Sequence, residues 1–238
     1  MNFPAESHNF ASSVCLCIEA SADSASACIV KDNISISEAI SPARHGHSET
    51  LIGLIEQVIS DSGCSADQID MIIAGCGPGS FTGLRVCLAT AHGYQLATNA
   101  QAAGISALVA LAASCLEGDD SHADRIISFC DSRRNSLFMQ VFDSDLTALS
   151  QIEDIRSDDV ADWLANWQTD GLSVMLAGDA GLLPQAVSQT YPCCCHLLTT
   201  ARLLAAMLIS DAGYLDSHPE YRLPLTPLYV HPAFVTQK

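Results

Sequence analysis

Lysine is nearly absent from this chain, whose 238 residues include only Lys31 and Lys238 and carry ten basic side chains against 27 acidic ones. The resulting net charge of −17 repels phosphate backbones, whereas proteins that hold nucleic acid usually present a basic stripe. We therefore expect no direct binding of DNA or RNA. The same charge favours a basic protein partner.

Charged residues of both signs are scarce, at 16%, whereas hydrophobic residues make up 49% and suffice for the core of one large domain or two small ones. No apolar run is as long as a membrane span. Residues 1–13 lack the basic start and apolar core of a secretory signal. These absences predict a cytoplasmic protein without membrane contact.

The eleven cysteines are an odd number in a long chain, which does not indicate a disulfide framework. Most lie in apolar runs as small fillers, which fits a reducing compartment. These are Cys15, Cys17, Cys28, Cys76, Cys87 and Cys130. For Cys193-Cys194-Cys195, a strand of alternating buried thiols is favoured over a metal site, because adjacent residues rarely converge on one ion. We expect no metal or other cofactor.

The pattern of apolar residues predicts two similar halves. In the first half, strands are expected at 14–20, 24–30, 34–40, 71–74 and 102–105, with helices at 48–60 and 81–97. Gly63 is expected to end the first helix, Ser65-Ala66-Asp67-Gln68 matches a capping box, and Ser106 is expected to cap a third helix that runs through Ala113. In the second half, strands are expected at 126–130, 137–142, 148–155 and 174–177, with one helix capped by Ser157 and another that includes Leu203 to Ile209.

This doubling predicts an α/β protein with two lobes of ribonuclease-H-like or actin-like fold, in which mixed sheets are flanked by helices. We expect residues 1–106 to form an N-terminal lobe and residues 107–211 to form a smaller C-terminal lobe. The segment from about 212 to 238, rich in proline, can return to the first lobe.

A glycine-rich turn joins the predicted strand 71–74 to the predicted helix 81–97. Many α/β proteins hold a phosphate at such a place, because the N–H groups at a helix N-terminus attract anions. A Walker loop, however, needs Gly-Lys-Ser/Thr after its glycines, and no lysine is near. Ser80 and Thr82 could act as nucleophiles only with a positioned base, which no pattern marks. Capping of the helix is the favoured role of Ser80.

Two acidic residues, Glu19 and Asp131, end equivalent strands of the two halves. They could face each other across a cleft between the lobes, as paired carboxylates around a metal ion or water. The favoured alternative is that both are solvated acids in turns of a duplicated fold.

The run Gly77-Pro78-Gly79-Ser80-Phe81-Thr82-Gly83-Leu84-Arg85 resembles the signature of the TsaB (YeaZ) family. Weaker matches follow in the family's order along most of the chain. They are His47-Ser48-Glu49, Gly104-Ile105-Ser106, Asp131-Ser132-Arg133 with Asn135, Gly178-Asp179 and Pro227-Leu228-Tyr229-Val230.

The resemblance implies an actin-like (ASKHA) fold and a non-catalytic role. TsaB proteins resemble truncated relatives of TsaD, the metal-dependent subunit that attaches a threonylcarbamoyl group to an adenosine beside the tRNA anticodon. A protein of this family would bind and activate TsaD as its dimerisation partner, and the ATPase TsaE would join the assembly.

Two departures concern the chemistry of the family. The family's first strand usually ends in Asp-Thr, whereas this chain has Glu19-Ala20, which would spoil a phosphate or magnesium position. TsaD-type enzymes hold their metal with two histidines four residues apart, and this chain has Ala107 and Leu111 at those places. These departures, with the missing lysine, argue against the alternative of a stand-alone enzyme, either a small-molecule kinase or a metallopeptidase.

The helices before and after the glycine loop contain more apolar and small residues than one core face needs, which suits packing against another subunit. Some of these residues are expected to belong to the core instead, and the sequence does not separate the two sets. The same helices allow a homodimer of the isolated chain. Arg85 has two candidate partners, an acidic group of another subunit or a loop carbonyl. The predicted interface comprises His47, Leu51, Ile52, Ile55, Arg85, Leu88, Ala89, His92 and Gly93, shaped by the loop Gly77, Pro78, Gly79, Ser80, Phe81, Thr82 and Gly83.

Overall fold

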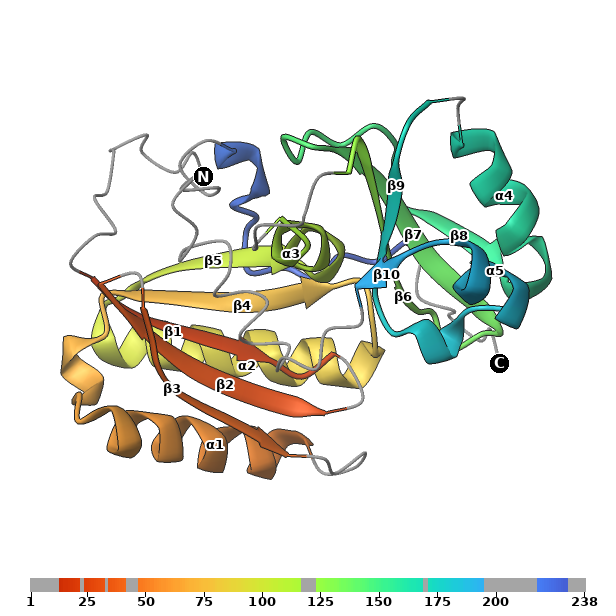
Figure 1. The fold of residues 1–238 in the computed structure, drawn as a ribbon. Coiled ribbons are helices and arrows are strands. Elements are labelled where there is room, and N and C mark those ends of the chain that lie inside the picture. Colours follow the sequence, from red (N-terminus) through yellow and green to blue (C-terminus); the bar gives the residue numbers. More distant parts are fainter. Residues whose placement is uncertain are drawn as a thin grey trace, which may run out of the picture.

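Two five-stranded mixed sheets lie side by side in the computed structural model (Figure 1). The residues that the structure describes are 13–21, 24–32, 34–41, 47–116, 123–168, 171–194 and 218–230. Within them, no helix is long and apolar enough to cross a membrane.

The first sheet has the strand order β3-β2-β1-β4-β5. Its first three strands form an antiparallel meander, and β4 and β5 continue parallel to β1. Every residue of β1 is buried because both faces of the sheet are covered. The strands are β1 (Val14–Glu19), β2 (Ala25–Lys31), β3 (Ile34–Ser41), β4 (Met71–Gly77) and β5 (Gln101–Ser106).

One face of this sheet is covered by α1 (His47–Ser62) and α2 (Phe81–Thr98), which lie beside each other (Figure 1). Gly63 follows α1 with a φ of 69°, a left-handed conformation that suits glycine, so the predicted end of the helix is confirmed. The capping box predicted by the sequence Ser65-Ala66-Asp67-Gln68 is also present, at the short 3-10 helix η2 (Ala66–Gln68).

The other face is covered by α3 (Ala107–Ser114), which lies between the two sheets (Figure 1). The Ser106 hydroxyl accepts a hydrogen bond from the Leu108 amide, which confirms the predicted cap. Small side chains make up much of α3, and they let both sheets approach it closely. One core cluster therefore includes Cys17 and Ile73 of the first sheet, the buried face of α3, and Phe142 of the second.

The second sheet, with the order β10-β9-β6-β7-β8, repeats the topology of the first. Its strands are β6 (Arg125–Asp131), β7 (Ser136–Asp143), β8 (Glu153–Arg156), β9 (Val174–Ala177) and β10 (Cys193–Cys194). Its helices are α4 (Val160–Trp167) and α5 (Gln185–Thr190), with the 3-10 helices η3 (Ser157–Asp159) and η4 (Ala180–Leu182). This repetition confirms the predicted fold class.

Two details of the second half differ from the sequence prediction. The strand expected over 148–155 is the short β8, and Ala148 makes only an isolated bridge to Phe142. Ser157 does not cap α4, because residues 157–159 form η3 and Asp159 occupies the N-cap position. The helix expected from Leu203, and Cys195, lie outside the described residues.

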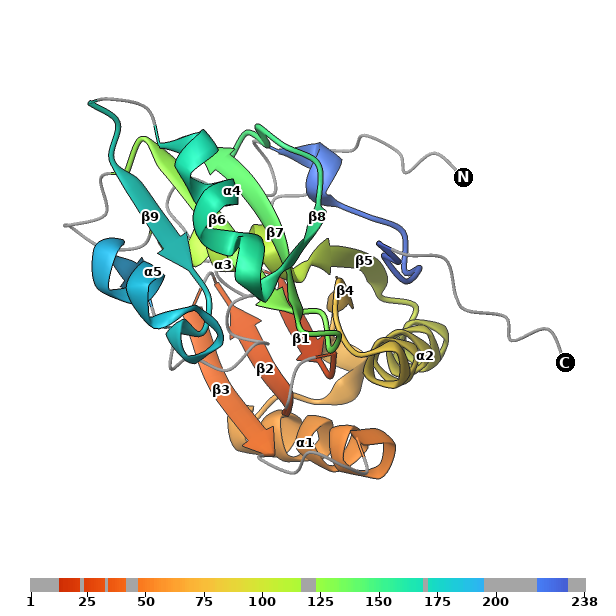
Figure 2. The same cartoon turned by 90° about the vertical axis from the view of Figure 1, so that its right-hand side faces the viewer.

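The C-terminal segment 218–230 contacts both halves and begins with the 3-10 helix η5 (Pro219–Tyr221). The Tyr221 hydroxyl donates to the Leu146 carbonyl. Farther along, Leu223 exchanges backbone hydrogen bonds of 2.7 and 2.9 Å with Gly104 of β5, at the edge of the first sheet (Figure 2). The Leu228 amide then donates to the Cys76 carbonyl at 2.7 Å.

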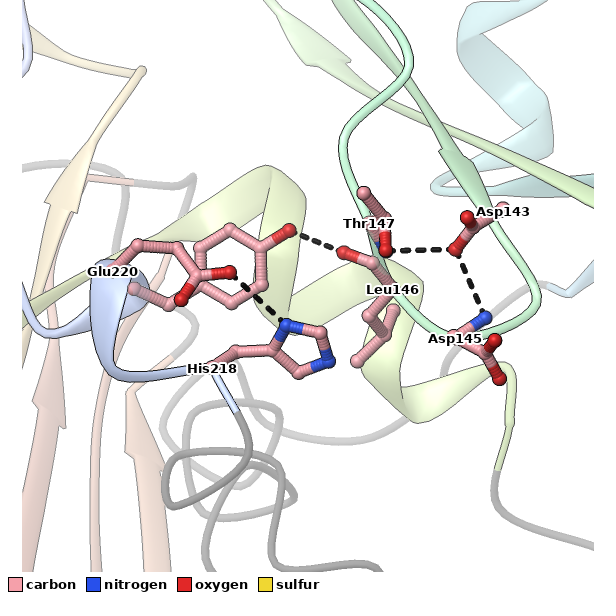
Figure 3. Close-up of polar contacts among 7 residues, drawn as sticks. Asp143, Asp145, Leu146, Thr147, His218 and Glu220 are labelled. Carbon is pink, nitrogen blue, oxygen red and sulfur yellow. Dashed lines mark hydrogen bonds and ion pairs between the residues drawn. The ribbon is translucent and has the colours of Figure 1, made fainter.

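The loop that receives η5 is held by its own side chains (Figure 3). The Asp143 carboxylate accepts from the amides of Asp145, at 3.0 Å, and Thr147, at 2.8 Å. On the opposite side, the His218 ring lies 3.1 Å from the Glu220 carboxylate. The loop of residues 143–147 therefore presents the Leu146 carbonyl to Tyr221 of the C-terminal segment.

Replacing Leu108 by alanine should lower the free energy of unfolding by about 2–5 kcal/mol, because this side chain is fully buried between the sheets. The matched control is Leu96→Ala, since Leu96 is 83% exposed on α2 and its truncation should change stability by less than about 0.5 kcal/mol. Urea unfolding of both variants measures the difference. Equal stability losses would contradict the placement of α3 in the core.

Candidate functional site

The glycine loop is a short connection between the end of β4 and the start of α2. The Ser80 hydroxyl accepts from the Gly83 amide at 3.3 Å, and the Ser80 carbonyl accepts from the Leu84 amide at 2.9 Å. The interpretation of Ser80 as a helix cap is thereby confirmed.

The glycines of this loop fit against the chain that follows β1. A Cβ atom on Gly83 would lie 1.9 Å from the Ala20 carbonyl oxygen, and one on Gly79 would lie 2.8 Å from the Ser21 carbonyl oxygen. The Ser80 amide donates to that same Ser21 carbonyl at 2.8 Å. Glycine is therefore required here because two segments of backbone touch, and part of the loop's donor capacity is used within the protein.

Glu19 is fully buried at the end of β1. Its Oε1 accepts from the amides of Ala20, at 2.8 Å, and Ser21, at 2.5 Å. Its Oε2 occupies the space that a Cβ on Gly75 would need, 1.6 Å away, and has no hydrogen-bond partner among the described residues. Burial raises the pKa of this carboxyl, and the hydrogen bonds from Ser21 and Ala20 oppose the rise only in part.

The prediction that Glu19 and Asp131 are both solvated turn acids is wrong for Glu19. Asp131 keeps 34% of its side chain exposed and lies 3.5 Å from the Arg133 guanidinium. The two acids thus occupy equivalent strand ends but have different surroundings. No group of three or more potential metal ligands occurs within the part of the chain that the structure describes.

Three thiols surround Glu19. Burial and the negative charge of Glu19 raise the pKa of Cys76 and of Cys130 to about 12, and the same two causes raise the pKa of Cys87 well above its ordinary value. Thiols with such pKa values stay protonated at neutral pH and are poor nucleophiles. The prediction that apolar runs bury their cysteines is confirmed for Cys15, Cys17, Cys28, Cys76 and Cys87, while Cys130 is half-buried.

The predicted interface residues divide between core and surface. Leu51, Ile55 and Leu88 are buried in the core beneath α1 and α2, so the prediction that they contact a partner is wrong. Ile52, Ala89, His92 and Gly93 are exposed on the same two helices. His47 begins α1, and its side chain lies outside the description.

Arg85 and His92, both predicted for the interface, contact the C-terminal segment. The Arg85 guanidinium lies over the Phe81 ring, 3.7 Å from its centroid, and its Nε donates to the Tyr229 hydroxyl at 3.4 Å. The His92 ring lies 3.1 Å from the Leu225 carbonyl oxygen. Within this chain Arg85 therefore contacts an aromatic pair, since Phe81 and Tyr229 stack with centroids 5.3 Å apart. Its predicted contact with an acidic group of another subunit stays a prediction.

A groove of about 490 Å³ opens beside the glycine loop, and sequence reasoning did not find it. Three segments distant in sequence border it, the start of α2, the turn between β6 and β7, and the end of the C-terminal segment. Its lining comprises Pro78, Gly79, Ser80, Phe81, Thr82, Leu84, Ser132, Arg133, Arg134, Phe138, Leu228, Tyr229 and Val230. The only sequence signal was that most of these residues fall in motifs of the family resemblance.

The turn between β6 and β7 holds its two arginines by local hydrogen bonds. The Asp131 carboxylate accepts from the Arg133 amide at 2.8 Å, and the Ser132 hydroxyl accepts from the Arg134 amide at 3.2 Å. Arg133 and Asn135 adopt positive φ values of 65° and 57°. These contacts fix the backbone that places Arg133 and Arg134 at the groove.

The duplicated order of strands and helices defines the class of protein, which is the two-lobed actin-like (ASKHA) fold. A solved structure titled YeaZ from Pseudomonas aeruginosa has this fold, with a TM-score of 0.70 and 19% sequence identity over 92% of this chain and 100% of that one. The family model described as "TsaD: tRNA N6-adenosine threonylcarbamoyltransferase" matches residues 36–195.

Curated relatives narrow the family assignment. The protein named tRNA threonylcarbamoyladenosine biosynthesis protein TsaB is 30% identical over 96 residues in Haemophilus influenzae and 26% identical over 99 residues in Escherichia coli. These alignments cover 40% and 42% of this chain, and the same shares of the relatives' lengths. The chain belongs to the TsaD family and, within it, to the TsaB (YeaZ) group.

Replacing Gly83 by alanine should lower the free energy of unfolding by about 3 kcal/mol or more, because its Cβ would overlap the Ala20 carbonyl. Gly93→Ala is the matched control on the same helix. Nothing lies within 4 Å of its Cβ position, so alanine should stabilise the helix by about 0.5–1 kcal/mol. Urea unfolding tests both, and a harmless Gly83→Ala would contradict the close contact.

Glu19→Gln should remove a pH dependence of stability. The pKa of Glu19 is raised in the folded state, so the folded protein holds this proton to higher pH than the unfolded chain does. Stability is therefore lost as the pH rises from the unfolded pKa through the folded one. Relative to Glu19→Gln, the natural protein should lose stability in urea unfolding as the pH rises above the unfolded glutamate pKa of about 4.3. Parallel pH profiles would contradict a buried Glu19.

Proposed function

We propose that this protein is a non-catalytic subunit that binds and activates TsaD in the synthesis of tRNA threonylcarbamoyladenosine. Its relatives carry the name of that pathway. TsaD is the proposed direct partner, and TsaE joins the same assembly. A homodimer of the isolated chain would use the same helix surface.

The observation that best supports a non-catalytic role is the contact between the glycine loop and the chain after β1. In a phosphate-binding loop the backbone N–H groups face the ligand. Here the Ser80 amide faces Ser21, and Glu19 turns into the protein to bind its own backbone. Ala107 and Leu111 stand where TsaD-type enzymes are expected to have their metal-binding histidines, and both lie on α3 between the sheets. The stand-alone enzyme is the less supported alternative.

The proposed contact with TsaD is the exposed surface of α1 and α2, which we call the helix surface and define by Ile52, Ala89, His92 and Gly93. Ile52 is 47% exposed, and small residues on α2 allow a partner helix to approach closely. Binding there would activate TsaD if TsaD's active conformation binds this surface more tightly than its inactive one.

The test is binding of purified TsaD from the same organism by calorimetry, together with tRNA modification by the mixture. Ile52→Glu and Ala89→Glu should each weaken binding by about tenfold or more, because a charge without a partner in an apolar interface is costly. The control is Leu149→Glu, since Leu149 is 43% exposed on the second half. It should bind normally.

Retained binding by both helix variants would contradict the proposed surface. Failure of the unaltered protein to bind TsaD or to restore modification would contradict the proposed function. Specific hydrolysis of ATP by the isolated chain would support the enzyme alternative instead.

A further inference from the structure

The groove beside the glycine loop is lined by basic residues, although the protein as a whole is acidic. The chain carries −17 overall, yet the described residues that line the groove include Arg133 and Arg134 and no acidic residue. Asp131 is not among the lining residues, and its carboxylate lies 3.5 Å from the Arg133 guanidinium. A local concentration of positive charge on an acidic protein attracts an anionic ligand.

Both arginines have contacts within the protein, as the Arg133 pair with Asp131 illustrates. A guanidinium carries five N–H donors and can contact more than one group at once, so a contact within the protein does not prevent an arginine from binding an external anion. The backbone hydrogen bonds of the turn hold both residues at the groove before any ligand arrives. The two planar forks therefore suit bidentate recognition of an oxygen anion.

The remaining lining favours a carboxylate on a peptide over a free phosphate. A phosphate cradle uses successive backbone N–H groups, but those of Ser80 and Gly83 donate to Ser21 and to the Ser80 hydroxyl. Next to the arginines, Phe81 and Tyr229 form a stacked pair in which each residue is 41% exposed. Arginine beside exposed aromatic rings is the composition typical of protein–protein contacts.

We propose that this groove binds an acidic peptide segment of a partner protein, with its carboxylates on Arg133 and Arg134 and an apolar side chain against Phe81 and Tyr229. A volume of about 490 Å³ is within the range of sites that enclose a small ligand. The inference goes beyond the proposed function, because the groove lies outside the helix surface and does not require TsaD.

The probe is a fluorescein-labelled synthetic peptide of alternating glutamate and phenylalanine, and binding is followed by fluorescence anisotropy. Its matched control replaces each glutamate by glutamine. We expect the glutamate peptide to bind more tightly than the glutamine peptide, and to bind less tightly as the salt concentration rises, because the contact is between charges near the surface. Equal binding of the two peptides would overturn the proposal.

Variants of the protein locate the contact. Arg133→Gln and Arg134→Gln should each weaken binding of the glutamate peptide by about three- to tenfold. Arg134→Lys keeps the charge but loses the planar fork, and should fall between Arg134→Gln and the natural protein. Lys31→Gln removes one exposed positive charge and should leave binding unchanged. Lys31 is at the end of β2 that pairs with Val14, whereas the other end of β2 pairs with Glu19. An equal loss with Lys31→Gln would overturn the proposal.

Competition separates a peptide site from a small-anion site. Inorganic phosphate and ATP should displace the peptide only at concentrations where salt of equal ionic strength does so. If phosphate or ATP displaces the peptide specifically, and if binding of that anion depends on Arg133, the groove would belong to a phosphorylated ligand and the proposal would be overturned. Pairing with TsaD, measured with the same variants, should be unchanged, so this proposal and the proposed function can fail separately.

Discussion

The structure depends on the close contact between the glycine loop and the end of β1. Gly75 accommodates the Glu19 carboxylate, and Gly79 and Gly83 lie against the backbone of residues 20–21. Any side chain at these three positions would separate the two segments. Because α2 begins within this contact, the same three positions set where α2 lies on the sheet. The helix surface and one wall of the groove both follow from that placement.

The same contact directs polar groups of the loop and of Glu19 toward the protein's own backbone. The Glu19 carboxylate accepts from the amides of Ala20 and Ser21, and the Ser21 carbonyl accepts from the Ser80 amide of the loop. Burial and the charge of Glu19 hold the neighbouring thiols in their protonated form. The surface of α1 and α2 exposes Ile52, Ala89 and Gly93, and the groove beside the loop is lined by Arg133 and Arg134.

The C-terminal segment gives several residues a role that their positions in the sequence did not suggest. Arg85 and His92, which lie on α2, contact Tyr229 and Leu225. Tyr221 contacts the second half, and Leu223 extends the edge of the first sheet. One short stretch therefore touches both sheets and completes the groove. These contacts join residues more than 70 positions apart, a separation at which no local pattern carries a signal.

The sequence by itself determined the elements and their repetition. Apolar periodicity located most of the strands and both long helices, and local hydrogen-bonding chemistry located the caps at Ser80 and Ser106 and the end of α1 at Gly63. Each of these rests on residues a few positions apart. The tertiary structure alone decided which apolar residues of α1 and α2 are core. Leu51 and Ile52 are neighbours in sequence, yet Leu51 is fully buried in the core whereas Ile52 is exposed to solvent. It also decided that Glu19 turns inward and that Arg133, Arg134 and Tyr229 meet at one groove, since these outcomes depend on contacts between distant segments.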